Sequence, residues 1–218
     1  MAVMNVNPTR MELTRLKKQL STATRGHKLL KDKRDELMRQ FLELVRETRS
    51  LREQVEAAIG EADRHFVEAG AAMQREAMEA ALLMPKQAVS LEVSARNVMS
   101  VDIPVFEAKT RTEQAGDIYS YGFAFTSFEL DDAVARLAAV LPDMLRLAEK
   151  EKAARLMAAE IEKTRRRVNA LEHVMIPRLQ ETIRYITMKL EENDRSSRTR
   201  LMKVKDMMLE NAHHYSAG

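Results

Sequence analysis

The chain has 218 residues, among them six Gly, five Pro, no Cys and no Trp, and only 5% of its residues are aromatic. Charged residues make up 32% of the chain and hydrophobic residues 45%, and 15 residues are Met. So few turn residues and aromatic side chains argue against a sheet-rich enzyme domain, while the hydrophobic content is too high for a disordered chain. The composition is typical of long amphipathic helices.

The absence of Cys excludes a disulfide scaffold, a thiolate zinc site and a cysteine nucleophile. No stretch approaches the roughly 18 consecutive apolar residues of a membrane span. Residues 1–7 lack the basic cluster and apolar run of a secretion signal. We therefore expect a cytoplasmic protein that does not insert directly into a membrane.

The net charge is only +3, but it is unevenly distributed along the chain. Residues 1–40 carry ten Lys and Arg against four Asp and Glu, a net charge of +6, whereas residues 81–140 have a net charge of −3. A basic first segment indicates a partner with an acidic surface, which could be nucleic acid, membrane or protein.

The first predicted element is a helix from Thr9 to about Leu83, a stretch without Pro. Asn7-Pro8 and the spacing of Thr9 and Glu12 are both typical of a helix start. Its seam residues repeat in alternating steps of three and four over about seven heptads, which predicts a coiled coil that must pair with another helix. Three seam residues are polar: His27, Arg34 and Thr48. The full seam consists of Leu13, Leu16, Leu20, Ala23, His27, Leu30, Arg34, Leu37, Phe41, Leu44, Thr48, Leu51, Val55, Ala58 and Ala62.

Residues from about Pro85 to Phe128 change to a period of two, which predicts short strands and a hairpin. The alternating residues are Val89, Leu91, Val93, Ala95, Val101, Ile103, Val105, Tyr119, Tyr121, Phe123 and Phe125. The predicted fold is mainly α: a long antiparallel coiled coil of N- and C-terminal helices, with a small β-hairpin and short-helix insert at one end. Its three segments are residues 1–83, 84–128 and 129–218.

The last segment is predicted to be helical from about Glu129 to Asn211 and supplies the partner of the first helix. We expect Pro142 to separate a short helix from the long one, and a stutter at Pro177 to kink the long one. We expect residues near 13 to face residues near 200, which would place 165–167 beside 45–50. The seam positions are Ile161, Thr164, Val168, Leu171, Met175, Leu179, Ile183, Ile186, Leu190, Asn193, Ser197, Leu201, Val204 and Met208.

Nucleotide and metal motifs are missing from the sequence. Residues 21–27 do not fit a Walker loop, because Ser21 occupies the position of its first Gly and Gly26 is followed by His27 instead of Lys. The sequence also lacks a Gly-x-Gly-x-x-Gly motif. None of the five His has a His partner four residues away, and His213-His214 is more typical of a solvated tail than of a metal site. We predict no catalytic residue, no cofactor and no metal.

The basic residues of the two long helices are the candidates for partner contacts. They form either a solvated helix face or a collar facing acidic loops of a protein partner. Nucleic acid is disfavoured as the partner, because the basic segments lack stacking aromatic residues. The candidates are Arg10, Arg15, Lys17, Lys18, Arg25, Lys28, Lys31, Lys33, Arg34, Arg165, Arg166 and Arg167.

Two blocks of the sequence, Asn7–Phe41 and Ile161–Asn193, resemble the D subunit of the V-type and A-type rotary ATPases. The resemblance implies a non-catalytic rotor subunit, whose coiled coil stands inside a ring of catalytic A and regulatory B subunits. It also implies that the insert end binds the small F subunit of the central stalk and rests on the socket subunit (C/d) above the membrane ring. The insert contacts on that stalk side would be Tyr119, Tyr121, Phe123 and Phe125.

A subunit of this kind would couple ATP hydrolysis or synthesis to ion translocation across the membrane, as a peripheral part of the complex. Whether the ion is H⁺ or Na⁺ stays open. The heptad pattern by itself fits an alternative equally well, a generic coiled-coil adaptor or scaffold protein.

Overall fold

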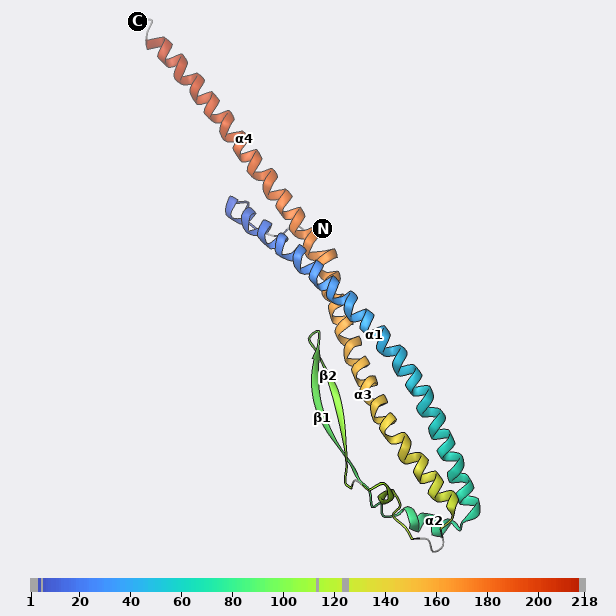
Figure 1. Ribbon diagram of the computed structural model, residues 1–218. Coiled ribbons are helices and arrows are strands. Elements are labelled where there is room, and N and C mark those ends of the chain that lie inside the picture. The colour runs from blue at the N-terminus through green and yellow to red at the C-terminus, as the bar shows by residue number, and fades with distance from the viewer. Residues whose placement is uncertain (1–3, 5, 113, 123–125, 216–218) are drawn as a thin grey trace. The chain divides into compact units, whose positions relative to one another are not determined.

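The computed structural model describes residues 4, 6–112, 114–122 and 126–215, with side chains described as far as Leu209. The elements, in chain order, are α1 (Arg10–Ala72), α2 (Arg75–Leu82), β1 (Val89–Val98), β2 (Val101–Thr110), η1 (Ala115–Ile118), α3 (Phe128–Ala170), η2 (Leu171–Met175) and α4 (Ile176–Tyr215) (Figure 1). The chain divides into two compact units. Unit 1 consists of Met1–Arg34 and Lys163–Gly218, and unit 2 of Asp35–Glu162.

Helix α1 begins where the sequence predicts. The backbone N–H of Glu12 donates to Oγ1 of Thr9 at 3.2 Å, and the N–H of Leu13 donates to the Thr9 carbonyl at 3.0 Å. All 15 predicted seam residues of this helix are buried or half-buried, which confirms the heptad assignment. The helix is shorter than expected, because it ends at Ala72 and the separate helix α2 follows.

Unit 1 pairs the first part of α1 with α4 in antiparallel orientation. Its core contains buried Leu16, Leu179 and Ile186, with Leu13 and Leu190 packed against them. The pairing extends through an ion pair of Arg10 with Asp194 at 3.2 Å and a hydrogen bond between Nε2 of His27 and Glu172 at 3.3 Å. The predicted register was therefore wrong: residues near 13 face residues 183–190, not residues near 200.

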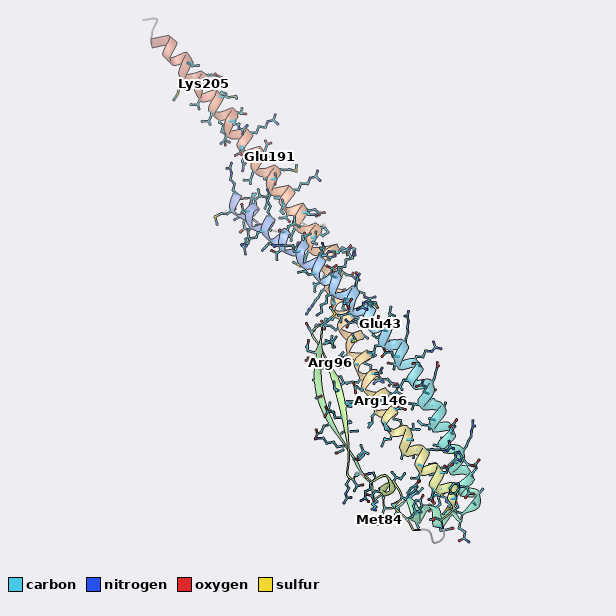
Figure 2. All side chains as sticks on the ribbon, in the orientation of Figure 1. Glu43, Met84, Arg96, Arg146, Glu191 and Lys205 are labelled. Carbon is cyan, nitrogen blue, oxygen red and sulfur yellow. The ribbon has the colours of Figure 1, made fainter. Side chains whose placement is uncertain are left out.

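This register leaves the last part of α4 without α1 beside it. The predicted seam residues Leu201, Val204 and Met208 are 69%, 42% and 68% exposed. Figure 2 shows Lys205 on this part of α4, beyond Glu191. The sequence continues the heptad pattern in this part of α4, but within the described residues no second helix packs against these side chains.

The two internal Pro residues of the C-terminal helices behave differently. Just ahead of Pro177 lies the π-helical turn η2, where the N–H of Ile176 bonds to the carbonyl of Leu171, five residues back. Such a turn accommodates one extra residue in the helix. The kink expected at Pro177 itself stays a prediction. The break predicted at Pro142 was wrong, because α3 continues through it. Pro142 is on the exposed side, where water can satisfy the carbonyl that loses its N–H partner.

Unit 2 packs three segments together: the second part of α1, α3 and the hairpin tip. Buried Leu37, Met157 and Ile161 form its core with Val101 of the hairpin. Across the helices, Nζ of Lys150 lies 2.7 Å from Glu47, and Arg52 pairs with Glu151. Glu47 thus faces Lys150, so the placement of 165–167 beside 45–50 was also wrong.

Strands β1 and β2 form an antiparallel hairpin, paired from Val89 with Thr110 to Val98 with Val101. The two turn residues, Met99 and Ser100, have φ values of 52° and 71°, the type I′ geometry that usually takes Asn-Gly. Asn97 supports this turn by accepting a hydrogen bond from the N–H of Ser100 at 3.1 Å. Both strands appear where the period-two pattern predicts them.

The third predicted strand, at Tyr119–Phe125, is not formed in its described part. The short η1 helix precedes it, and Tyr119–Gly122 follow an irregular path. Phe123 and Phe125 lie outside the described residues. Alternation over so few residues cannot separate a strand from an irregular segment with alternate aromatic side chains.

Candidate partner-binding surfaces

The predicted basic contacts all belong to unit 1. Ten of the twelve side chains are exposed, and Lys33 and Arg34 are half-buried and engaged in interactions. Unit 1 carries 21 Lys and Arg against nine Asp and Glu, a net charge of +12. Unit 2 carries 15 Lys and Arg against 24 Asp and Glu, a net charge of −9. The small net charge of the chain therefore conceals two units of opposite sign.

Six basic residues of α1 lie on one flank of the helix, and we call them the basic stripe. At about 100° per residue, they fall within an arc of roughly 140° beside the seam. The stripe consists of Arg10, Lys17, Lys18, Arg25, Lys28 and Lys31. Arg15 and Lys33 lie on the opposite flank and Arg34 on the seam, so the stripe holds six of the nine basic residues that α1 contributes to unit 1.

The lysines of the stripe are available to a partner. Among the described residues, Lys17, Lys18, Lys28 and Lys31 have no carboxylate within 4.0 Å. Arg10 pairs with Asp194, but at an exposed site where such a pair contributes little and can exchange for another partner. The stripe can thus attract acidic loops electrostatically.

The aromatic residues of the insert are only partly available for contacts. Tyr119 and Tyr121 are half-buried, with ring centroids 6.2 Å apart in an edge-to-face arrangement. The hydroxyl of Tyr121 donates to Oδ1 of Asp131 at 2.9 Å. Burial raises the pKa of Tyr121, and the Asp131 carboxylate raises it further, so the phenol stays protonated. Tyr121 therefore also fastens the insert to the start of α3.

The clefts of unit 2 are shallow, and most of their charged groups bond to neighbouring groups of the same unit. One cleft of about 320 Å³ is lined by Glu43 and Glu47 of α1, Arg96 of β1, and Glu149 and Lys150 of α3. Figure 2 shows Arg96 on the hairpin and Glu43 on α1. Lys150 bonds to Glu47 at 2.7 Å, and Glu149 accepts the N–H of Phe106 at 3.2 Å. These two contacts hold α1, the hairpin and α3 together around the cleft.

Two further observations concern only the described residues. No three His, Asp or Glu side chains there are grouped closely enough to hold a metal ion. No helix in that part of the chain contains a stretch long and apolar enough to cross a membrane.

Sequence reasoning missed an exposed apolar flank on the second part of α1. Met38, Leu42 and Val45 are 40%, 48% and 39% exposed. They follow the seam residues by one position, and this repeated spacing was the signal that could have revealed them. Contiguous exposed apolar side chains of this kind are typical of contacts with other proteins.

Paired long helices with a small antiparallel hairpin define a mainly helical protein of the coiled-coil class. A family model that describes the D subunit of ATP synthase matches residues 12–206. The V-type ATP synthase D subunit of Acetivibrio thermocellus is 62% identical over 215 residues, 99% of this chain and 97% of the relative. That of Clostridioides difficile is 64% identical over 212 residues, 97% of this chain and 95% of the relative.

The chain therefore belongs to the D-subunit family of the ATP synthases. This confirms the resemblance based on residues 7–41 and 161–193. The match extends through the hairpin and most of α4, so it covers both units.

Proposed function

We propose that this chain is the central rotor axle of a V-type ATP synthase. In this role it is a non-catalytic subunit, which couples ATP hydrolysis or synthesis in a ring of A and B subunits to ion translocation. The observation that carries the proposal is the exposed basic stripe on a family member whose long helices pair in antiparallel orientation.

An axle must present different surfaces to catalytic sites that are chemically identical. A contact shifts a site between conformations only when it binds one of them better than the other. Because the stripe occupies one flank of α1, each rotational position would offer Lys28 and Lys31 to a different site. A charge distributed evenly around the helix would favour none of them.

The proposed partners are the catalytic A and regulatory B subunits around unit 1, and the F subunit and the socket subunit at unit 2. The exposed apolar flank of Met38, Leu42 and Val45 supports protein contacts at unit 2. The complex would hold the chain on the cytoplasmic face, peripheral to the membrane. No nucleic acid is required.

Rotation can be tested directly because the chain has no Cys. A Glu76→Cys variant carries a single thiol on exposed α2, to which a bead can be attached. With the A and B subunits fixed to a surface, we expect stepwise rotation of the bead upon addition of ATP. A stationary bead on a complex that hydrolyses ATP at the normal rate would contradict the axle role.

The role of the basic stripe needs a separate experiment. We expect the double change Lys28→Glu and Lys31→Glu to reduce ATP-driven rotation on the order of tenfold, because like charges would then face an acidic partner. The matched control is Arg46→Glu with Arg64→Glu, which changes two exposed bases of the same helix in unit 2. Equal rotation rates for both double variants would rule out the stripe as the contact.

A further inference from the structure

Strand β1 has a backbone edge that the rest of unit 2 leaves uncovered. The two-residue turn makes Val98 and Val101 a hydrogen-bonded pair, so every second residue of β1 bonds to β2. The bond from the N–H of Arg111 to the carbonyl of Ala88, at 2.8 Å, continues this alternation at the hairpin base. The N–H groups that point away from β2 therefore belong to Val89, Leu91, Val93, Ala95 and Asn97.

The opposite edge of the hairpin is blocked. Its outward positions are Asp102, Pro104, Phe106, Ala108 and Thr110. Pro104 has no N–H, and the N–H of Phe106 donates to the Glu149 carboxylate of α3 at 3.2 Å. Another strand could not form a regular ladder along β2.

None of these protections is found on β1. Its ten residues pair in one regular register, without Pro, Lys or a bulge, and within the described residues no hydrogen bond to another element reaches its five outward amides. Native proteins normally protect such an edge, because it is a template for a further strand. An isolated two-stranded hairpin is also only marginally stable in water.

The side chains of β1 define what could bind there. Val89, Leu91 and Val93 share one face and are 39%, 41% and 63% exposed. On the other face Glu92 and Arg96 stand four residues apart, and Lys109 lies 2.5 Å from Glu92. An added strand would therefore meet an apolar face on one side and two opposite charges on the other.

We propose that β1 binds an extended segment of a partner polypeptide as the third strand of the sheet. The segment carries apolar residues at alternate positions, which extend the face of Leu91 and Val93. Its other face carries a basic residue opposite Glu92 and an acidic residue opposite Arg96. Main-chain hydrogen bonds supply the binding, and the side chains supply the selectivity. The inference requires assembly with other subunits but is independent of any rotation of the helices.

Residue-resolved amide hydrogen exchange tests the proposal, comparing the isolated chain with the purified ATPase complex that contains it. In the isolated chain the outward amides of Leu91, Val93 and Ala95 exchange fast, while the inward amides of Glu92 and Ser94 are protected. In the complex we expect the outward amides to exchange at least tenfold more slowly. Unchanged exchange of these three amides would overturn the proposal.

A matched pair of Pro variants tests the same edge. Val93→Pro removes an outward N–H from β1, and Ala108→Pro removes one from β2, where Pro104 shows that Pro is tolerated. We expect only Val93→Pro to abolish the protection of Leu91 and Ala95 in the complex. Protection of Ser94 in the isolated variants verifies that the hairpin still forms. Equal protection of Leu91 and Ala95 in the two complexes would overturn the proposal.

A second copy of the chain is the competing occupant. Protection of Leu91 and Val93 that appears in the isolated chain as its concentration rises would assign the edge to self-association and overturn the partner strand. The result of the exchange experiment on β1 can also be interpreted independently of the axle role. A bead on Glu76→Cys that stays stationary, in a complex with a protected β1 edge, would refute only the axle.

Discussion

Units 1 and 2 use their charged residues in different ways. In unit 2 several ion pairs connect neighbouring segments, as between Lys150 and Glu47, Arg52 and Glu151, or Lys86 and Asp117. In unit 1 four lysines of the basic stripe face solvent with no carboxylate within 4.0 Å among the described residues. Unit 2 thus uses its charges internally, whereas unit 1 leaves positive charge available to other chains.

The strongest test of this comparison is whether the two units can be destabilised separately. Ile186→Ala in unit 1 and Leu130→Ala in unit 2 each truncate a side chain that is 0% exposed. We expect each to cost about 2–5 kcal/mol of unfolding free energy, through lost burial and a new cavity. Hydrogen exchange should show the loss of protection mainly in the mutated unit. Equal losses in both units would show that they unfold as one.

A smaller effect is expected where the N-terminal segment is attached to unit 1. Oγ1 of buried Thr182 accepts the N–H of Met4 at 3.2 Å and donates to the carbonyl of Arg178 at 2.7 Å. Thr182→Val should cost about 1 kcal/mol, measured by urea unfolding, because the N–H of Met4 loses its partner. The control Thr187→Val removes only a bond to the carbonyl of Ile183 and should cost less. Equal losses of unfolding free energy in the two variants would contradict a stabilising hydrogen bond between Met4 and Thr182.

The hairpin turn of unit 2 should gain stability from a single change. Ser100 has a φ of 71°, a conformation that is costly for every residue except Gly. We expect Ser100→Gly to slow exchange of the inward β1 amides, with a gain of about 0.5–1 kcal/mol. Ser94→Gly, in the middle of the strand, should have the opposite sign. Faster exchange in Ser100→Gly would contradict a strained turn.

The smallest expected effect is that of low pH on the contacts at the open end of the hairpin, opposite its turn. A hydrogen bond from Lys86 lowers the pKa of Asp117 below its ordinary value of 3.8, and Thr112 lowers it further. The stabilisation is therefore complete at neutral pH and is lost as the pH falls below about 4. We expect the protection factor of the Thr112 amide to decrease there, and Lys86→Met to lower it already at pH 7. A constant protection factor down to pH 3 would contradict this.

Much of the fold could be predicted because the seam follows from local spacing alone. Every predicted seam position of α1 is shielded, and even polar His27 finds Glu172 across the pair. The offset between the two helices could not be predicted, because any shift by whole heptads leaves the same side chains on the seam. That freedom explains why 165–167 was placed beside 45–50.

The remaining errors arose where tertiary packing outweighs a local signal. Pro142 disfavours a helix, but α3 is held on both sides of it by buried residues, among them Val140 and Ala153. The surfaces were harder still to predict. The heptad pattern assigns Leu201 to a seam, and only the three-dimensional pairing shows that α1 does not reach it.

The antiparallel pairing also has a consequence for the order of folding. The hairpin closes through a two-residue turn, so its contacts are local in sequence. The contacts between the long helices are separated by increasing lengths of chain: 99 residues for Arg52 and Glu151, 145 for His27 and Glu172, and 184 for Arg10 and Asp194. Closing the longest loop first is entropically unfavourable, but each pair formed shortens the loop that the next pair must close. Pulsed hydrogen exchange during refolding should therefore protect the amides of unit 2 before those of unit 1. A nascent chain would then complete its negatively charged unit first and its positively charged unit only after synthesis of α4, late in translation.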